Sequence, residues 1–238
     1  MQHDVTRLVI VRHGETAWNL DTRIQGHTDI PLNERGLWQA RQAGLALRDE
    51  GIDAIYSSDL QRAAQTAEAI AQACGLTVTR DPSLRERHFG RFEGFTHDEI
   101  VAQWPEEGRR WRQRDPAYGP EGGETLTDFY ERTVGAARRL ALAHPGQTIA
   151  LVAHGGVLDC FYRAATHVGM SAPRSWKIAN ASINCLIHSS EGFSLIGWAD
   201  TRHLDEPGGE GLDEATDGAT TGSAPGPFVH ATDLSPAR

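Results

Sequence analysis

Residues 7–14 read Arg-Leu-Val-Ile-Val-Arg-His-Gly, a short apolar run that ends in an arginine, a histidine and a glycine. The apolar, β-branched core of this run predicts a buried parallel strand over residues 7–12. Residues 148–156 repeat the arrangement as Thr-Ile-Ala-Leu-Val-Ala-His-Gly-Gly. A His-Gly pair therefore follows each of the two most apolar strands, and each imidazole is delivered to the carboxyl edge of the sheet. If the two strands are neighbours, His13 and His154 converge.

Strands and helices alternate along the rest of the chain. We predict further strands over residues 53–57, 76–80, 182–189 and 193–199, and helices over residues 33–50, 58–73, 96–104, 106–114, 124–143 and 156–167. This alternation predicts an α/β domain with a mostly parallel sheet, which binds ligands at the carboxyl ends of its strands. From Pro207 the composition turns to Gly, Pro, Ser, Thr and Asp. We expect one domain over residues 1–204 and a mobile tail over residues 205–238.

The net charge of −9 is unevenly distributed. Residues 203–238 hold seven acidic residues and one basic residue, which leaves a net charge near −3 on the rest of the chain. No basic stripe is present, so nucleic acid is not an expected partner. The three cysteines form no CxxC motif, and we find neither a signal sequence nor a membrane-spanning stretch. We therefore expect a cytoplasmic protein with no membrane partner.

Charged residues follow the other predicted strands at equivalent positions along the sheet edge. Arg62 lies one helical turn into the helix after residues 53–57, and Glu86 follows the strand over residues 76–80. Each alone would be read as a surface residue, but together with Arg12 they bring guanidinium groups and a carboxyl group to the two imidazoles. The glycine after each histidine allows a small anion to approach the backbone closely. The chain has no metal-binding motif and no P-loop, so we expect side chains to hold the anion without a metal.

Four motifs in this order resemble a known family, and they are RHGETAWN at 12–19, SSDLQRAAQTAE at 57–68, LRERHFGRFEG at 84–94 and VAHGG at 152–156. They are similar to the histidine phosphatase superfamily, in the branch that contains cofactor-dependent phosphoglycerate mutases and their phosphatase relatives. The resemblance covers about residues 7–200, and PEGGETLTDFYER at 120–132 is typical of the phosphatase-like members. It implies a three-layer α/β/α sandwich of the phosphoglycerate mutase-like type.

The resemblance also implies roles for individual residues. His13 corresponds to the histidine that is phosphorylated, and Glu86 corresponds to the acid that protonates the leaving group. The residues that bind the phosphoryl group correspond to Arg12, Arg62, His154 and Asn19. Pocket-lining and backbone contacts correspond to Gln25, Gly26 and Gly155. In addition, two residues flank the acid and are candidate substrate contacts, Arg87 and His88.

These residue types suit phosphoryl transfer. Guanidinium groups beside His13 lower its pKa and keep it neutral, as a nucleophile must be. They also stabilise the charge on the phosphoryl oxygens. A carboxylic acid near an anionic substrate has a raised pKa, so it can protonate the leaving group and afterwards activate water. This chemistry needs no metal and no nucleotide cofactor.

Members of the family pass the phosphoryl group either to water or back to the substrate. The mutases have a longer insertion before the second histidine, with a lysine and an Arg-Arg pair that clamp the substrate, and usually an asparagine where this chain has Gly156. Here the interval has no lysine, and the pair is replaced by Arg112-Gln113. Other arginines that could substitute are Arg109, Arg110 and Arg114. We therefore predict a metal-independent phosphomonoester hydrolase that acts on small phosphorylated metabolites, as a monomer or a homodimer.

Two alternatives stay open. The chain could be a phosphoglycerate mutase, an isomerase of glycolysis that requires 2,3-bisphosphoglycerate. It could also be a non-catalytic protein that binds phosphorylated ligands, but such a protein would be expected to lack the nucleophile or the acid. His13 and Glu86 are both present. The phosphatase is therefore the favoured interpretation, even if the name phosphoglycerate mutase were attached by similarity.

Overall fold

A six-stranded sheet organises residues 5–205, the part of the chain that this computed structural model describes. The strands are β1 (Thr6–Arg12), β2 (Ala54–Ser57), β3 (Val78–Arg80), β4 (Thr148–Ala153), β5 (Ile183–Ser189) and β6 (Gly192–Asp200), in the spatial order β3-β2-β4-β1-β5-β6. The first four in this order pair in parallel, and β5 and β6 add an antiparallel hairpin. The predicted α/β class with a mostly parallel sheet is confirmed. All of the tail predicted over residues 205–238, except residue 205, lies outside the described residues.

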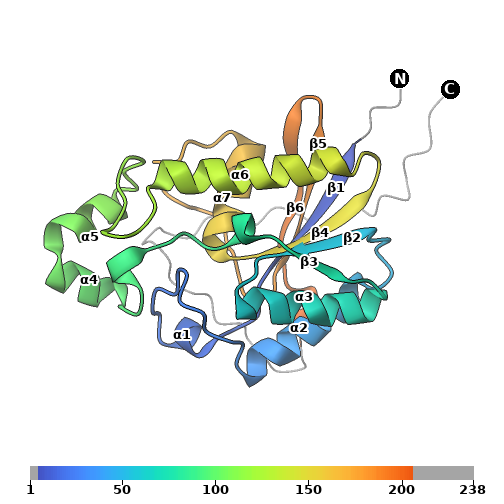
Figure 1. Ribbon diagram of the computed structural model, residues 1–238, viewed down its shortest axis with the longest axis horizontal. Coiled ribbons are helices and arrows are strands. Elements are labelled where there is room, and N and C mark those ends of the chain that lie inside the picture. The colour runs from blue at the N-terminus through green and yellow to red at the C-terminus, as the bar shows by residue number, and fades with distance from the viewer. Residues whose placement is uncertain (1–4, 206–238) are drawn as a thin grey trace.

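Helices cover both faces of this sheet (Figure 1). One layer contains α2 (Glu34–Leu47) and α3 (Gln61–Cys74), and the opposite layer contains α6 (Leu126–Ala143) and α7 (Gly155–Thr166). Successive side chains of a strand point to opposite faces, and β1 shows the consequence. Val9 and Val11 pack in the core under α2 and α3, whereas Leu8 and Ile10 pack in the core under α6 and α7. The implied three-layer sandwich is confirmed.

The two strands that end in His-Gly are neighbours. β1 and β4 pair in parallel at the centre of the sheet, with Arg12 opposite Ala153 at their carboxyl ends. The backbone N–H of His13 continues this ladder by donating to the Ala153 carbonyl at 2.9 Å. The condition set by the sequence is therefore met, and both imidazoles leave the sheet at the same edge.

The remaining helices form an extension beyond this edge (Figure 1). They are α1 (Ala17–Leu20), α4 (His97–Gln103) and α5 (Pro105–Arg112). The short 3₁₀ turns lie at Pro82–Leu84 beside α6, at Gly90–Phe92 under the extension and at Arg202–Leu204 beside α2. A separate aromatic cluster stabilises α4 and α5, with Phe92, Ile100 and Tyr118 buried at its centre. Trp104 and Trp111 pack against them. The extension thus has its own small core, which holds it over the sheet edge.

The start of α3 differs from the prediction. The helix predicted over residues 58–73 would be capped by Ser58 or Asp59, but α3 begins at Gln61 after Leu60, which has no side-chain capping bond. The backbone N–H of Gln61 instead donates to the Asp29 carboxylate at 2.7 Å. Asp59 pairs with Arg85, because the two side chains meet when the loops fold together. The prediction was wrong because the cap comes from a loop distant in the sequence.

No helix within residues 5–205 combines the length and the apolar character that crossing a membrane would require.

Candidate active site

A cavity of about 760 Å³ opens at the carboxyl edge of the sheet, between the central strands and the α4–α5 extension. Nine of the eleven site residues predicted from the sequence line it. They are Arg12, His13, Asn19, Gln25, Gly26, Arg62, Glu86, Arg87 and Gly155. The other two are His154, which lies fully buried beside His13, and His88, which is absent from the lining. One cavity therefore brings together groups from four widely separated segments.

The two histidines lie side by side, with His13 in the cavity lining and His154 buried next to it. Their ring centroids are 5.2 Å apart, and His13 and His154 are 3% and 0% exposed. The His13 ring has Nδ1 2.7 Å from the Gly14 carbonyl oxygen. A carbonyl only accepts hydrogen bonds, so Nδ1 must carry the proton. The Nε2 lone pair of the neutral ring is then available as a nucleophile.

The surroundings of His13 keep its ring neutral. Burial lowers the pKa of His13 well below 6.5, and the guanidinium groups of Arg62 and Arg12 lower it further. Burial and the Arg62 charge lower the pKa of His154 in the same direction. Neither ring nitrogen of His154 has a hydrogen-bond partner among residues 5–205. A buried ring without a partner is costly, so this ring is placed for a ligand rather than for the fold.

These depressed pKa values predict how stability depends on pH. Below pH 6.5 the unfolded chain protonates His13 and His154, whereas the folded protein does not. Stability from the neutral rings is therefore fully present above that pH and is lost as the pH falls, by up to about 1.4 kcal/mol per pH unit for each histidine. Urea unfolding at a series of pH values should give a shallower loss for His13→Gln than for the wild type. Equal slopes would contradict the buried, neutral state of His13.

Two arginines flank the histidines and are fixed through the backbone. Arg62, at the start of α3 and 1% exposed, donates to the carbonyls of Gly26 at 2.7 Å and Thr28 at 3.0 Å. Its Nε has no hydrogen-bond partner in the described part of the chain. Arg12, the last residue of β1, donates to the Ile178 carbonyl at 2.6 Å. Burial lowers the pKa of Arg62 to about 10, so it stays charged at neutral pH. Both guanidinium groups therefore lie in the cavity lining together with His13.

Glu86 faces the histidines from the loop after β3. Its two carboxylate oxygens accept from the backbone N–H groups of Arg87 at 2.8 Å and Gly156 at 2.9 Å. Burial nevertheless outweighs these bonds and raises the pKa of Glu86. Gly156 makes the close approach feasible, because a Cβ atom there would lie 2.3 Å from Glu86 Oε1. The cavity therefore contains a carboxyl group that is suited to hold a proton.

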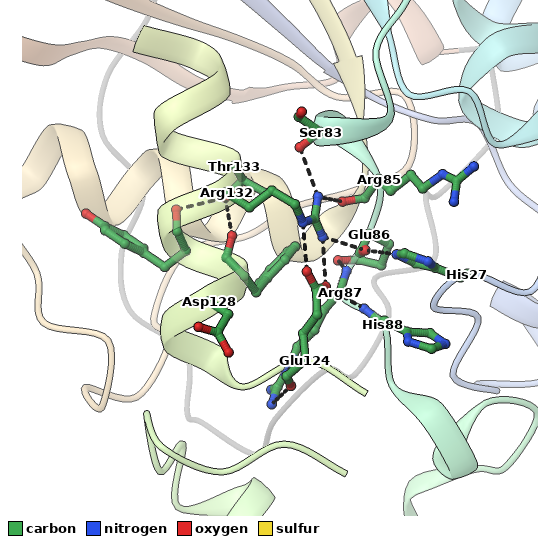
Figure 2. A network of polar contacts seen from close by, with 12 residues as sticks. His27, Ser83, Arg85, Glu86, Arg87, His88, Glu124, Asp128, Arg132 and Thr133 are labelled. Atoms are coloured by element: carbon green, nitrogen blue, oxygen red, sulfur yellow. Dashed lines mark hydrogen bonds and ion pairs between the residues drawn. The ribbon is translucent and has the colours of Figure 1, made fainter. Parts of the chain in front are cut away.

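The two residues after Glu86 behave differently from each other. Arg87 lines the cavity, but its guanidinium is buried and donates to the carbonyls of Tyr118 at 2.7 Å and Glu124 at 2.9 Å. Burial lowers its pKa to about 10. The His88 ring turns away from the cavity and packs on His27, with centroids 4.7 Å apart (Figure 2). Arg87 thus touches both the cavity and the loop above it, whereas His88 supports the outer loops.

Asn19 and Gly26 have structural contacts as well as cavity positions. The Asn19 side chain completes a capping box with Thr16 at the start of α1 and accepts from Asn180 at 3.3 Å. Gly26, next to Gln25, has φ +50 and lies where a Cβ would meet the Glu93 carboxylate at 2.2 Å. Glu93 in turn accepts from the backbone N–H groups of His27 and Thr28, so it fixes the loop that holds Arg62.

Further arginines lie toward the outer part of the cavity. Of the residues considered as substitutes for a mutase clamp, Arg112 and Arg114 line it. Arg109 and Arg110 do not, because they pair with Glu106 and Asp115 on the extension. Arg114 donates to Asp159 of α7 at 2.7 Å. Sequence reasoning did not single out Asp159 or the other lining arginines, which are Arg23 and Arg174, since no motif surrounds them.

The sequence also missed a pair at the start of α6. The helix predicted over residues 124–143 opens with Glu124 and Thr125, which could cap it or contact the substrate, and Thr125 caps it by accepting from the Asp128 N–H. Glu124 instead forms an ion pair with Arg132, with an Nε–Oε1 distance of 2.7 Å. Glu124 also accepts from the His88 N–H at 2.8 Å, so this pair lies directly behind the Glu86 loop (Figure 2). An i, i+8 spacing gave no local signal for it.

A protein family with a matching model can be compared with this chain. Residues 8–201 match the model of the histidine phosphatase superfamily, branch 1. The chain belongs to this superfamily. Among curated relatives, the phosphoglycerate mutase-like protein 4 of Arabidopsis thaliana is 39% identical over 209 residues, which are 86% of this chain and 90% of that protein. The metal-independent phosphoserine phosphatase of the same plant is 36% identical over 211 residues, which are 87% of each.

Solved structures agree with the family. A mycobacterial glucosyl-3-phosphoglycerate phosphatase, in its complex with VO3, is 34% identical and superimposes with a TM-score of 0.73 over 82% of this chain and 99% of that one. The phosphatase interpretation fits these relatives, and the mutase alternative is represented among them as well. Among residues 5–205, no group of three or more His, Cys, Asp or Glu residues is arranged to hold a metal ion.

Proposed function

We propose that this histidine phosphatase hydrolyses small phosphomonoesters through a phosphohistidine on His13. One observation supports the proposal most directly, which is the contact of His13 Nδ1 with the Gly14 carbonyl. Because Nδ1 carries the proton, the lone pair of Nε2 is free to attack. The protonated arginines and the buried carboxyl of Glu86 in the same cavity support it. Relatives of metal-independent type support a mechanism without a metal.

The first step transfers the phosphoryl group to the protein. His13 Nε2 attacks phosphorus, the P–O bond to the leaving group breaks, and Glu86 gives its proton to the leaving oxygen. Arg12 and Arg62 stabilise the charge on the phosphoryl oxygens. His154 is neutral, and its ring nitrogens have no hydrogen-bond partner within the described residues, so it can donate one N–H to a phosphoryl oxygen.

The second step returns the protein to its starting state. The Glu86 carboxylate takes a proton from water as the water oxygen attacks phosphorus, the P–N bond to His13 breaks, and inorganic phosphate leaves. Glu86 is again protonated and His13 is again neutral. The raised pKa of Glu86 suits both roles, because the same group must release and regain a proton near neutral pH.

Gly156 favours transfer of the phosphoryl group from His13 to water, rather than back to another oxygen of the substrate. A side chain at this position, such as the asparagine usual in mutases, would collide with the Glu86 carboxylate as it lies here. The outer cavity has arginines, Arg112 and Arg114, but Arg114 is already engaged with Asp159. A phosphatase is therefore better supported than a mutase dependent on 2,3-bisphosphoglycerate. A cytoplasmic location is proposed from the three free cysteines.

A panel of phosphomonoesters tests the proposal, with phosphate release and isomerisation measured side by side. Each assay is run with and without 2,3-bisphosphoglycerate, and with and without EDTA. We expect phosphate release that needs neither the bisphosphate nor a metal. Isomerisation that depends on the bisphosphate would support the mutase, and binding of phosphorylated ligands without turnover would support the non-catalytic alternative.

The contact at Gly156 gives a further prediction. In Gly156→Ala the new methyl group lies 2.3 Å from the end of the Glu86 side chain, which can swing away, and 3.2 Å from the Phe129 ring, which must shift slightly. The displaced acid should lower kcat on an alkyl phosphate by roughly 10- to 100-fold. The matched control is Gly135→Ala, where a Cβ meets nothing within 4 Å. Equal activity of the two variants would show that the Glu86–Gly156 contact does not matter for catalysis.

A further inference from the structure

A guanidinium group behind the active site holds the loop that carries Glu86. Arg132 extends from α6 toward this loop (Figure 2). Its Nη1 donates to the carbonyls of Ser83 at 2.9 Å and Arg85 at 3.1 Å, and its Nη2 donates to the carbonyl of Glu86 at 3.2 Å. One side chain thus fixes three carbonyls in a stretch of four residues that ends at the proposed acid.

The remaining donors of Arg132 go to Glu124. Nε lies 2.7 Å from Glu124 Oε1, and Nη2 lies 2.8 Å from Oε2. With the three carbonyls, these contacts occupy all five N–H donors of the guanidinium group. A bidentate pair of this kind is geometrically specific as well as strong. Lysine, with three donors on a flexible stem, cannot reproduce the arrangement.

Glu124 attaches to the same loop on its far side. Its carboxylate accepts from the His88 N–H at 2.8 Å, and its backbone N–H donates to the His88 carbonyl at 2.8 Å. Its own carbonyl accepts from the Arg87 guanidinium. Residues 83–88 form the acid loop, which carries Glu86. The pair holds this loop on both sides of Glu86, because Arg132 bonds residues 83–86 and Glu124 bonds residues 87–88.

The Glu86 residue itself is held only through its backbone by this pair. Its carbonyl accepts from Arg132 and lies 2.9 Å from Nε2 of His27, while its carboxylate contacts the N–H groups of Arg87 and Gly156. The largest charge effects on this carboxyl come from Arg62 and Arg12. Arg132 is not itself a lining residue of the cavity, and its hydrogen bond to Glu86 goes to the carbonyl and not to the carboxylate. Its effect on Glu86 is therefore one of geometry.

We infer that Glu124 and Arg132 are positioning residues that aim the Glu86 carboxyl at the leaving oxygen of the substrate. This inference rests on the proposed function, in which Glu86 is the proton donor. A purely structural pair would lower the stability of the fold and affect all substrates alike. A positioning pair affects the substrates that need the proton.

Two substrates separate these cases. An alkyl phosphate has a poor leaving group and needs the proton, whereas an aryl phosphate with an acidic phenol departs without it. The value of kcat/KM reports the step up to phosphoryl transfer, so the later attack by water does not obscure the comparison. We expect Arg132→Met to lower kcat/KM on the alkyl phosphate by roughly 10- to 100-fold. On the aryl phosphate the loss should be under about threefold.

Further variants keep the test decisive. Arg132→Lys should regain only part of the kcat/KM that Arg132→Met loses on the alkyl phosphate. Glu124→Gln should lower the ratio of kcat/KM on the alkyl phosphate to kcat/KM on the aryl phosphate, even if Arg132→Met folds poorly. The matched control is Arg139→Ala, which removes an α6 arginine that pairs with Asp81, just before the acid loop, and contacts none of residues 83–88. This control should leave the ratio of the two substrates unchanged.

The outcomes distinguish the inference from the proposed function. Equal loss on both substrates, no loss on either, or full rescue by lysine would overturn the positioning role and leave the phosphatase standing. A wild-type protein that releases no phosphate from either substrate would overturn the proposed function, and this inference with it. A selective loss on the alkyl phosphate, absent in Arg139→Ala, supports both.

Discussion

His13→Ala is expected to lower phosphatase activity by at least about 10⁴-fold on every substrate, because the variant has no group that can form the covalent intermediate. The effect should be as large on an aryl phosphate as on an alkyl phosphate, since both pass through phosphohistidine. The measurement is phosphate release under single-turnover conditions, with no burst expected from the variant.

The fold and the anion site should survive this substitution. His13 is buried, but among residues 5–205 its ring hydrogen-bonds only to its neighbour Gly14, and Arg12 and Arg62 are anchored on other carbonyls. The variant should therefore still bind inorganic phosphate. Retained turnover in a folded His13→Ala protein would rule out the covalent mechanism, whereas loss of both folding and binding calls for the smaller change His13→Asn.

Glu86→Gln is expected to lower kcat/KM on an alkyl phosphate by about 10²- to 10⁴-fold, the usual contribution of a general acid. The amide retains the shape of the carboxyl group and can still accept from the N–H groups of Arg87 and Gly156. It cannot give a proton to the leaving oxygen. An aryl phosphate should therefore still phosphorylate His13 at close to the wild-type rate.

The second step then fails for a different reason. Without the Glu86 carboxylate, water is not activated, so the aryl substrate should give one rapid burst of phenol followed by slow turnover. The matched control is Glu121→Gln, because Glu121 is exposed and pairs only at the surface with Arg91. Equal losses on both substrates, with no burst, would contradict the proton-transfer role of Glu86.

The parts of the site that the sequence predicted are those fixed by strand ends. His13 and His154 follow two apolar strands directly, so their convergence needs only that the strands be neighbours. Arg62 and Glu86 follow β2 and β3 within a short distance, and the same sheet edge brings them in. Hydrophobic patterning decides such positions, because a buried strand has little freedom of register.

The parts that the sequence did not predict depend on contacts between loops. The ring of His88 turns to His27 because residues 25–28 fold against the acid loop. Asp29 caps α3, and Arg132 reaches carbonyls almost fifty residues earlier in the chain. No local propensity encodes these pairings. They appear only when the tertiary structure offers a partner that is closer than the one expected from sequence.

The most direct test of the central claim is to trap the phosphoryl group on the protein. Glu86→Gln is mixed with an aryl phosphate, quenched in base and analysed by intact-mass and peptide mass spectrometry. We predict one added phosphoryl group per chain, located on His13, and none in the double variant His13→Ala/Glu86→Gln. A burst of phenol with no phosphoryl group on His13, or with the group on another residue, would contradict the account.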